Sequence, residues 1–274
     1  MTIQKTFDSS ITSRRKSWIY LQENFAEEYN SLLNEGKLQE GSGADILWQT
    51  SQKFVLKVAS PAGRNIVFKS YRKIKDRRKY ILRLTPCGLE AGNYQALTNL
   101  GFPMARLLAV GEERTFFLVK KAFLITEFAE GYQDGKVFLP YNFRQEDAAL
   151  RDEFIRLNLQ LLAKLHDCGY LHQGFMPGNL LWKRNPDSDQ MDLIWIDVAT
   201  CRKVSPNKIR KSIGFEVGNF FRLFDFSMDK IRDCLNYYLE ASRSSLVSRD
   251  ELISAVETEL QRRAAKKAER QQNR

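Results

Sequence analysis

Histidine and cysteine are both scarce in this chain of 274 residues. Only two histidines are present, His166 and His172. The sequence therefore argues against a histidine-rich metal site and against a Ser-His hydrolase triad. The four cysteines are Cys87, Cys168, Cys201 and Cys234. They are widely separated and include no C-x-x-C pair, so we expect reduced thiols rather than disulfides or a zinc site.

Long apolar runs are also absent. No stretch approaches the roughly 18 apolar residues that a membrane-spanning helix needs. The opening stretch MTIQKTFDSSITSRRKSW lacks the apolar core of a signal peptide. We therefore expect a cytoplasmic protein with no integral membrane segment. Hydrophobic residues make up 43% of the chain, which is enough for one large domain or for two lobes with separate cores.

Positive charge is plentiful. The chain has 43 Lys and Arg against 33 Asp and Glu, a formal net charge of +10. Such a balance suits a polyanionic partner such as nucleic acid, phospholipid or a phosphorylated glycan, although a basic protein can also be merely soluble. The basic stretches lack the interleaved aromatic residues that stack on bases. We therefore expect no nucleic-acid partner.

The first 36 residues contain a helical pattern. Trp18, Leu21, Phe25, Tyr29 and Leu32 recur at spacings of three and four, which predicts one face of a helix that stops at Gly36. We interpret residues 1–36 as an N-terminal helical extension.

Residues 37–131 read as a small lobe rich in strands. The runs ADILWQT, KFVLKVA and RNIVFKSY are separated by Thr-Ser-Gln and Pro-Ala-Gly turns, which predicts three consecutive antiparallel strands. A helix over 89–100 and two further strands over 101–131 follow.

Residues 132–274 read as a mainly helical lobe. The first predicted helix has a stripe made of Leu150, Phe154, Leu157, Leu161 and Leu165. A loop and the short strand LIWIDVA come next, then a helix over 220–241. Ser248 and Glu251 form a capping box that opens the last helix. The fold class that this order predicts is α+β, with two lobes and a cleft between them.

Charged and polar residues suited to phosphoryl transfer occur in a suggestive order. That reaction needs a lid over the phosphates, a Lys to hold them, a Glu to hold that Lys, and Asn plus Asp to hold magnesium. The candidates, in chain order, are Gly41 and Gly43, Lys69, Glu90, Asn179 and Asp197. Taken singly, each of these residues has an ordinary structural explanation and does not indicate phosphoryl transfer. The pattern H-x-x-x-x-P-x-N-L-L, followed within twenty residues by a strand ending in Asp, is specific.

Two lysines compete for the phosphate-binding position. Lys57 in VLKV and Lys69 in IVFKSY both lie on predicted strands. We choose Lys69, because it ends the third strand, directly before the helix that carries Glu90. Lys57 on the second strand is then expected to face solvent.

On these motifs the chain resembles the lipopolysaccharide kinases that phosphorylate Kdo or heptose sugars of the inner core, a branch of the protein-kinase-like fold. The resemblance covers roughly residues 40 to 240, and its most specific pieces are IVFKSYR, LTNLGFPMARLLAVGE, LITEFAEG, LAKLHDCGYLHQGFMPGNLLW and LIWIDVATCRK. It implies a small antiparallel N-lobe, a helical C-lobe, ATP and Mg²⁺ as cosubstrates, and an adenine pocket at Glu127, Phe128 and Ala129. It also implies transfer of phosphate to a hydroxyl of an inner-core sugar.

The departures from this family raise an alternative. Gly174 stands where such enzymes carry the Asp that accepts the hydroxyl proton. The family's helix Glu would fall near Asn93, one turn after Glu90, and Asn219 stands where an Asp often steadies the loop. Either another carboxylate such as Asp167 accepts the proton, or the chain is a nucleotide-binding pseudokinase with a regulatory or scaffolding role. Aminoglycoside-type kinases, which share the P-x-N pattern, are a third possibility.

Basic clusters flank the predicted cleft. One follows Lys69 and comprises Arg72, Lys73, Lys75, Arg77, Arg78 and Lys79. The other follows Asp197 and comprises Arg202, Lys203, Lys208, Arg210 and Lys211. We expect them, with Arg72, Lys73, Arg202 and Lys203 foremost, to contact the lipopolysaccharide core or another anionic glycolipid, or to dock peripherally on the cytoplasmic face of the inner membrane. The basic end, RRAAKKAERQQNR, is interpreted as a solvated tail.

Overall fold

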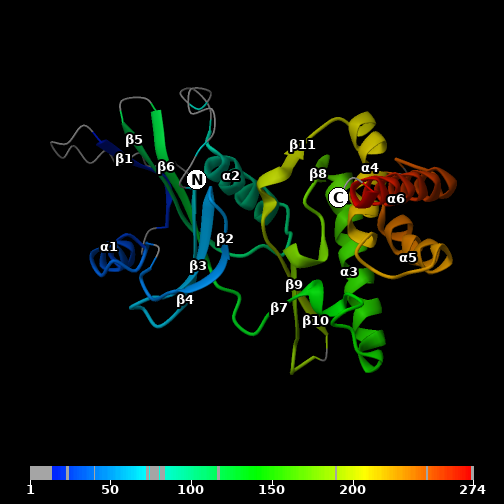
Figure 1. The fold of residues 1–274 in the computed structure, drawn as a ribbon, viewed down its shortest axis with the longest axis horizontal. Coiled ribbons are helices and arrows are strands. Elements are labelled where there is room, and N and C mark those ends of the chain that lie inside the picture. The colour runs from blue at the N-terminus through cyan, green and yellow to red at the C-terminus, as the bar shows by residue number, and fades with distance from the viewer. Residues whose placement is uncertain are drawn as a thin grey trace. The chain divides into compact units, whose positions relative to one another are not determined.

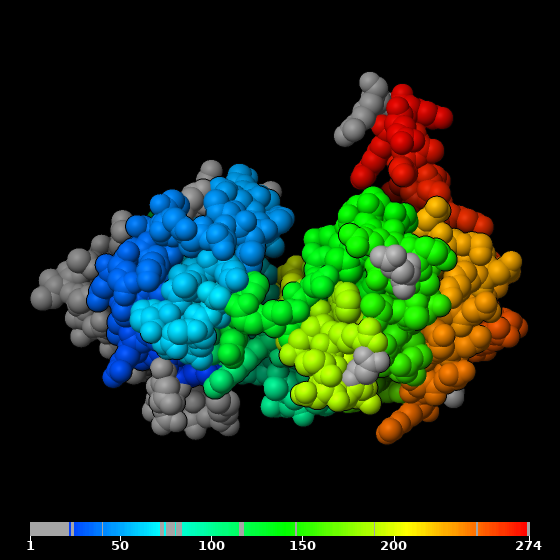
Figure 2. Space-filling view, turned by 90° about the horizontal axis from the view of Figure 1, so that it is seen from below, coloured from blue at the N-terminus to red at the C-terminus, as the bar shows by residue number. Residues whose placement is uncertain are grey.

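The computed structural model describes residues 14–22, 25–39, 41–71, 74, 80, 84–115, 118–188, 190–244 and 246–272. The chain divides into two compact units, Met1–Glu130 and Gly131–Arg274, which are coloured in chain order from blue to red (Figure 1 and Figure 2).

The first unit is built on a six-stranded sheet with the order β1-β5-β6-β4-β3-β2, in which all neighbours are antiparallel. The strands are β1 (Arg14–Leu21), β2 (Asp45–Gln49), β3 (Lys53–Ala59), β4 (Asn65–Tyr71), β5 (Leu107–Thr115) and β6 (Leu118–Glu127). The predicted run of three antiparallel strands is confirmed as β2 to β4, and the two later strands as β5 and β6.

The helix predicted through Trp18 and Leu21 is wrong. These residues lie on β1, which pairs with β5, and the helix α1 spans only Ala26–Asn34. The run WIYL is rich in residues that favour strands, and the edge of β5 offers it backbone partners. Pairing with a distant strand therefore overrides the local three-and-four spacing. Both β1 and α1 are parts of the first unit.

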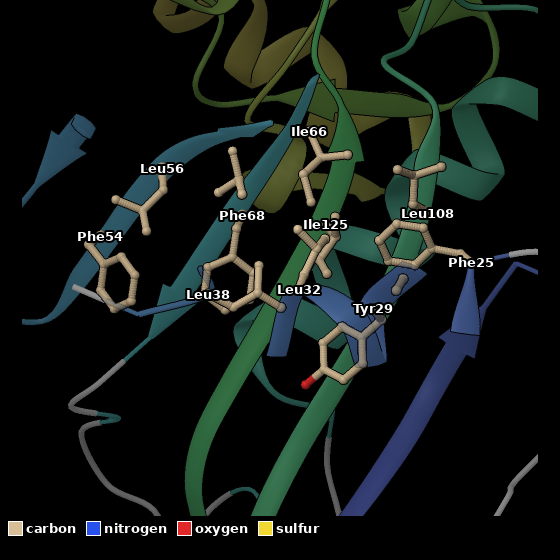
Figure 3. Close-up of a cluster of buried hydrophobic side chains, with 12 residues drawn as sticks. Phe25, Tyr29, Leu32, Leu38, Phe54, Leu56, Ile66, Phe68, Leu108 and Ile125 are labelled. Atoms are coloured by element: carbon tan, nitrogen blue, oxygen red, sulfur yellow. The ribbon is translucent and has the colours of Figure 1, made fainter. Parts of the chain in front are cut away.

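The two faces of this sheet are covered differently. On one face, α1 packs against alternate residues of the strands, so that Tyr29 and Leu32 meet Leu56, Ile66 and Ile125 in a buried apolar cluster (Figure 3). The other helix, α2 (Pro86–Asn99), contacts β5 and β6 and begins at the N-cap Thr85, whose side chain accepts a hydrogen bond from the amide of Gly88. The helix predicted over 89–100 is thus confirmed, with an earlier start.

The second unit is mainly helical. Its helices are α3 (Ala148–Asp167), α4 (Pro206–Phe221), α5 (Met228–Ala241) and α6 (Arg249–Gln272). Its short strands are β7 (Gln133–Asp134), β9 (Leu180–Arg184) and β10 (Met191–Trp195) in one sheet, and β8 (Tyr170–His172) with β11 (Cys201–Lys203) in another. The capping box is confirmed: the Ser248 amide donates to Glu251 at 2.9 Å, and the Glu251 amide donates to the Ser248 hydroxyl at 3.2 Å.

Two details of the helical predictions are wrong. A single helix over 220–241 does not form, because α4 ends at Phe221 and Ser227 caps a new helix by accepting a hydrogen bond from the Lys230 amide. The buried face of α3 also includes Asn158 and His166, while Leu157 and Leu161 are only half-buried. A helix face identified from the spacing of apolar residues omits buried polar residues such as these.

Buried Asn158 ties α3 to the strand that leads to Asp197. The indole Nε1 of Trp195, at the end of β10, donates to the Asn158 side-chain oxygen at 2.9 Å. The Asn158 amide in turn donates to the Phe154 carbonyl at 2.8 Å. The long helix therefore holds the end of β10 in place.

Among the described residues, we find no helix that combines the length and the apolar content needed to cross a bilayer.

Candidate active site

Lys69 and Glu90 form a buried ion pair in the first unit. The Lys69 Nζ lies 2.9 Å from both carboxylate oxygens of Glu90, and the two residues are 7% and 1% exposed. A carboxylate this deeply buried is costly unless it is paired, so each residue depends on the other. The partner of Lys69 is Glu90, one turn before Asn93, as the sequence suggests.

The alternation along β4 explains where this lysine points. Ile66 and Phe68 belong to the cluster under α1, so Lys69 lies on the opposite face of the sheet. That is the face on which Glu90 of α2 meets it.

The expectation that Lys57 faces solvent is wrong. In the antiparallel register Val55 is opposite Lys69 and Lys57 is opposite Val67, so the two lysines point to the same face of the sheet. The Lys57 ammonium lies 4.2 Å from the centre of the Phe128 ring and 3.8 Å from a carboxylate oxygen of Glu130. A sequence shows the alternation within each strand but not the register between strands.

Lys53 is a third lysine on this face, and sequence reasoning missed it. Its ammonium lies 4.6 Å from the centre of the Trp48 ring and 5.8 Å from that of Tyr71. The Lys69 ammonium lies 5.9 Å from the centre of the same Tyr71 ring. Lys53 and Lys69 therefore converge on one aromatic side chain.

The predicted lid glycines lie before β2. Gly41 and Gly43 both have φ of +79°, and Asp45, which follows them, pairs with Lys57. The turn that joins β2 to β3 is at the other end of the strand, where the Thr50 amide donates to the Lys53 carbonyl at 2.8 Å. This turn, rather than the glycine pair, is next to Lys53. A lid role for Gly41 and Gly43 stays a prediction.

The predicted adenine segment begins at the last residue of β6 in the first unit. The Glu127 amide donates to the Arg106 carbonyl at 2.9 Å, and the Phe128 amide donates to the Asn65 carbonyl at 3.0 Å. Ala129 comes next. These backbone bonds hold the segment beside β4, with the Lys57 ammonium over the Phe128 ring.

The loop of the second unit that carries Gly174 is held by two asparagine amides. The Asn179 side chain donates to the Gly174 carbonyl at 2.9 Å, and Asn219, which is 4% exposed, donates to the Phe175 carbonyl at 3.0 Å. Asn219 therefore steadies the loop, at the position where an Asp was expected from the resemblance.

Asp197 is tied to the same loop. The amide of Ile196 donates to the Asn179 carbonyl at 2.9 Å, which brings Asn179 and Asp197 close together. Asp197 has φ of 55° and ψ of 50°, the one left-handed backbone conformation outside glycine among the described residues. Asp tolerates this region, and backbone strain of this kind is typical of functional sites.

The donor set of these two residues fits magnesium. Mg²⁺ prefers carboxylate and other oxygen ligands. The hydrogen bond from the Asn179 amide nitrogen to Gly174 leaves the amide oxygen as the atom that can bind a cation. Asp197 would supply a carboxylate oxygen.

His172 is a packing residue beneath this loop. It is fully buried between the rings of Phe175 and Trp195, and neither ring nitrogen has a hydrogen-bond partner within the described structure. Burial lowers the pKa of His172 to about 4, although Asp197 acts in the opposite direction. The imidazole is therefore neutral near pH 7.

This buried imidazole should make the protein sensitive to acid. An unfolded histidine takes up a proton near pH 6.5, whereas the folded one resists until about pH 4. Stability should therefore fall as pH drops through this window, by about 1.4 kcal/mol per pH unit from this group. We expect His172→Leu to have a shallower loss of Tm between pH 7 and 5 than the parent protein. Parallel curves for the two proteins would contradict this assignment.

Asp167 is engaged elsewhere. Its carboxylate accepts hydrogen bonds from the amides of Arg243 and Ser244 at 2.8 and 3.1 Å, and from the hydroxyls of Ser242 and Ser244. Partial burial raises the pKa of Asp167, but these hydrogen bonds together hold it below its ordinary value. These hydrogen bonds give Asp167 a structural role in the turn after α5.

Two of the four predicted substrate-binding residues lie within the described part of the chain. Arg202 and Lys203 lie exposed on β11, where they pair with Leu171 and Tyr170 of β8. Arg72 and Lys73, with all the rest of their cluster, lie outside the described residues.

Comparison with known proteins places these features in a family. Residues 48–217 match the model of the lipopolysaccharide kinase (Kdo/WaaP) family. A search of curated proteins found no match. The chain is similar to a solved structure described as WaaP in complex with acyl carrier protein, with 17% identity, a TM-score of 0.61, and coverage of 90% of this chain and 98% of that chain. This likeness confirms the kinase-like α+β fold, with a small antiparallel sheet and a mainly helical second part.

Proposed function

Because the chain belongs to the lipopolysaccharide kinase (Kdo/WaaP) family and is therefore a kinase, we propose that it transfers the γ-phosphate of ATP to a hydroxyl of an inner-core sugar, heptose or Kdo. The observation that carries the proposal is the buried pair of Lys69 and Glu90, which has the form of a phosphate-binding lysine and its brace. The reaction would take place at the cytoplasmic face of the inner membrane.

The residues have distinct roles in this proposal. Lys69 holds the α- and β-phosphates, and Glu90 keeps its ammonium in place. Asn179 and Asp197 hold Mg²⁺, which neutralises the charge that develops on the phosphates. Glu127, Phe128 and Ala129 receive the adenine, and Arg202 and Lys203 contact the anionic acceptor.

Lys53 adds a second cation for the phosphates. The charge of Lys69 is balanced by Glu90, whereas Lys53 makes no salt bridge within the described part of the chain. The adjacent turn, Thr50-Ser51-Gln52, contains no glycine that would let its backbone approach the phosphates closely. A lysine side chain held by Trp48 and Tyr71 can make that contact instead.

The function can be tested by turnover. Purified protein, ATP and Mg²⁺ should release ADP faster when deacylated lipopolysaccharide is added, and phosphate should appear on the sugar. Turnover that does not respond to this acceptor, or that responds only to aminoglycosides, would overturn the proposed substrate.

The Asp197 assignment makes a separate prediction about binding. The parent protein should bind a non-hydrolysable ATP analogue more tightly with Mg²⁺ than without it, and Asp197→Asn should lose this gain. Asn tolerates the left-handed backbone of this position as Asp does, so the substitution removes charge without backbone strain. Isothermal titration calorimetry measures both affinities. An Asn variant that keeps the full magnesium effect would show that the strand-end carboxylate does not hold the ion.

Gly174 favours a second candidate function, a pseudokinase that binds nucleotide and acts as a regulatory or scaffolding partner. The position beside the acceptor hydroxyl has no carboxylate, and Asp167 is engaged in the turn after α5. General-base assistance contributes about 10² to 10⁴ in rate, so its loss slows transfer without removing the charge stabilisation by lysine and magnesium. For this reason we favour the catalytic function over the pseudokinase.

A further inference from the structure

The second unit contains an open groove of about 1870 Å³ beside the loop of Gly174. Gln173 and Met176 of the loop line it, as do the end of α4, the start of α5 and the C-terminal half of α6. Figure 2 shows that end of α6, in red, projecting from the rest of the unit. The sequence stretch interpreted as a solvated tail is thus one wall of a groove.

Two glycines fix α6 in this position. A Cβ at Gly214 of α4 would lie 2.6 Å from the Ala255 carbonyl oxygen, and one at Gly218 would lie 2.8 Å from Cγ of Glu259. The absence of side chains there lets α6 pack directly on α4, where Leu252 and Val256 are buried. The basic half of α6, beyond this contact, is therefore held at a defined place over the groove.

The groove is strongly cationic. Seven of its lining residues are Lys or Arg, whereas two, Glu257 and Glu269, are Glu. Glu257 binds Arg232, and Glu259, which is not itself a lining residue, binds Arg262 at 2.7 Å and Arg263 at 2.5 Å. The other four make no salt bridge within the described part of the chain and are Arg222, Lys266, Lys267 and Arg270. The groove therefore has unbalanced positive charge to offer a ligand.

Aromatic rings form the apolar part of the groove. Phe215 is 37% exposed, and the Arg263 guanidinium lies 5.0 Å from the centre of its ring. Phe224 and Phe226 also line the groove, and their rings stack at 5.2 Å. Flat apolar faces next to free cations suit a ligand that has both apolar faces and anionic groups, as phosphorylated sugars do.

Arg222 connects the groove to the loop. Its Nε donates to the Asn219 side-chain oxygen at 2.9 Å, and Asn219 donates to the Phe175 carbonyl, next to Gly174. Partial burial and the nearby Arg263 lower the pKa of Arg222, as expected for a cation whose charge is poorly balanced. Only the side chains of Arg222 and Asn219 would therefore separate a bound anion from the loop of Gly174, where the proposed reaction takes place.

We infer that this groove binds the phosphorylated glycan of the acceptor, with phosphates on Arg222, Lys266 and Lys267 and sugar faces against the phenylalanines. The inference rests on the proposed function and adds the surface that recognises the acceptor.

The test compares two charge reversals of equal size. Lys266→Glu with Lys267→Glu alters the groove, and Lys120→Glu with Lys121→Glu makes the same change on β6 of the first unit. The probe is deacylated lipopolysaccharide core that retains its phosphates. We expect the groove variant to bind it at least about tenfold more weakly than the parent at low salt, and the β6 variant to bind nearly as the parent does. The KM for ATP should stay unchanged in both.

The outcomes separate this inference from the function itself. Equal loss in both variants, or none in either, would overturn the groove as the acceptor site. Binding to phosphatidylglycerol vesicles but not to the core would assign the groove to membrane docking instead and would also overturn it. Binding to the groove without phosphorylation of the core would contradict the proposed reaction while leaving glycan recognition in place. Thermal unfolding of each variant confirms that it is folded.

Discussion

Replacing Lys69 with alanine is expected to lower kcat/KM for ATP by about 10² to 10³-fold or more, the loss that follows removal of one preorganised charge-stabilising group. Lys69 is the lysine that Glu90 fixes in place, with both carboxylate oxygens at 2.9 Å. Lys53→Ala should have a smaller effect, mainly on nucleotide affinity. Lys57→Ala should have the smallest, because its ammonium rests on Phe128 and near Glu130.

The experiment must separate catalysis from stability. Lys69→Ala removes the ammonium that pairs with the buried Glu90 carboxylate, which can cost about 3 to 5 kcal/mol of folding free energy. The paired change Lys69→Met with Glu90→Gln removes both charges and keeps the bulk, so it should fold better and remain inactive. Activity per folded protein is measured for all variants, with Tm as the control. Equal losses for Lys57→Ala and Lys69→Ala would show that the phosphate lysine is misassigned.

The elements that could be predicted from the sequence are those set by local patterns. Alternation in KFVLKVA and NIVFKSY, with turn residues between them, was sufficient for β3 and β4. The capping box at Ser248 marked the start of α6, because its hydrogen bonds lie within four residues. The pairing of Lys69 with Glu90 followed from the order of strand and helix in a known family.

The features that could not be predicted depend on residues far apart in the chain. The strand β1 forms because β5 is beside it, and no local pattern shows that. Lys53 and Lys57 join the face of Lys69 through the register of β3 on β4, which a single strand does not reveal. The groove exists because Gly214 and Gly218 admit α6, which turns a basic helix end into a binding surface.

The local structure around Gly174 makes a restored carboxylate feasible. The residue has no positive φ, so the backbone itself accepts a side chain. A Cβ there would lie 3.2 Å from the Thr200 hydroxyl oxygen and 3.5 Å from the Asn179 amide nitrogen. Thr200 is exposed and needs to move by only a few tenths of an ångström. Both groups can then donate hydrogen bonds to a new carboxylate.

Gly174→Asp is expected to raise kcat for transfer to the acceptor, by up to about 10² to 10⁴, because a base beside the acceptor hydroxyl supplies the missing general-base assistance. The gain would be smaller if another group already accepts the proton. Repulsion between the new carboxylate and Asp197 opposes the gain unless magnesium is bound, so rates are compared at saturating Mg²⁺.

The matched controls for this change are Gly174→Asn, which has the same shape without the charge, and Gly174→Ala, which measures the cost of a Cβ. Only the Asp variant should gain activity, and the Tm of all three should be similar. If the folded Asp variant is slower than the Asn variant, the parent uses a different base that the new charge disturbs. If none of the proteins turns over, although each binds Mg-ATP, the lysine and metal groups hold nucleotide without transferring phosphate. That result would replace the catalytic proposal with the pseudokinase, since the one missing group would have been restored without effect.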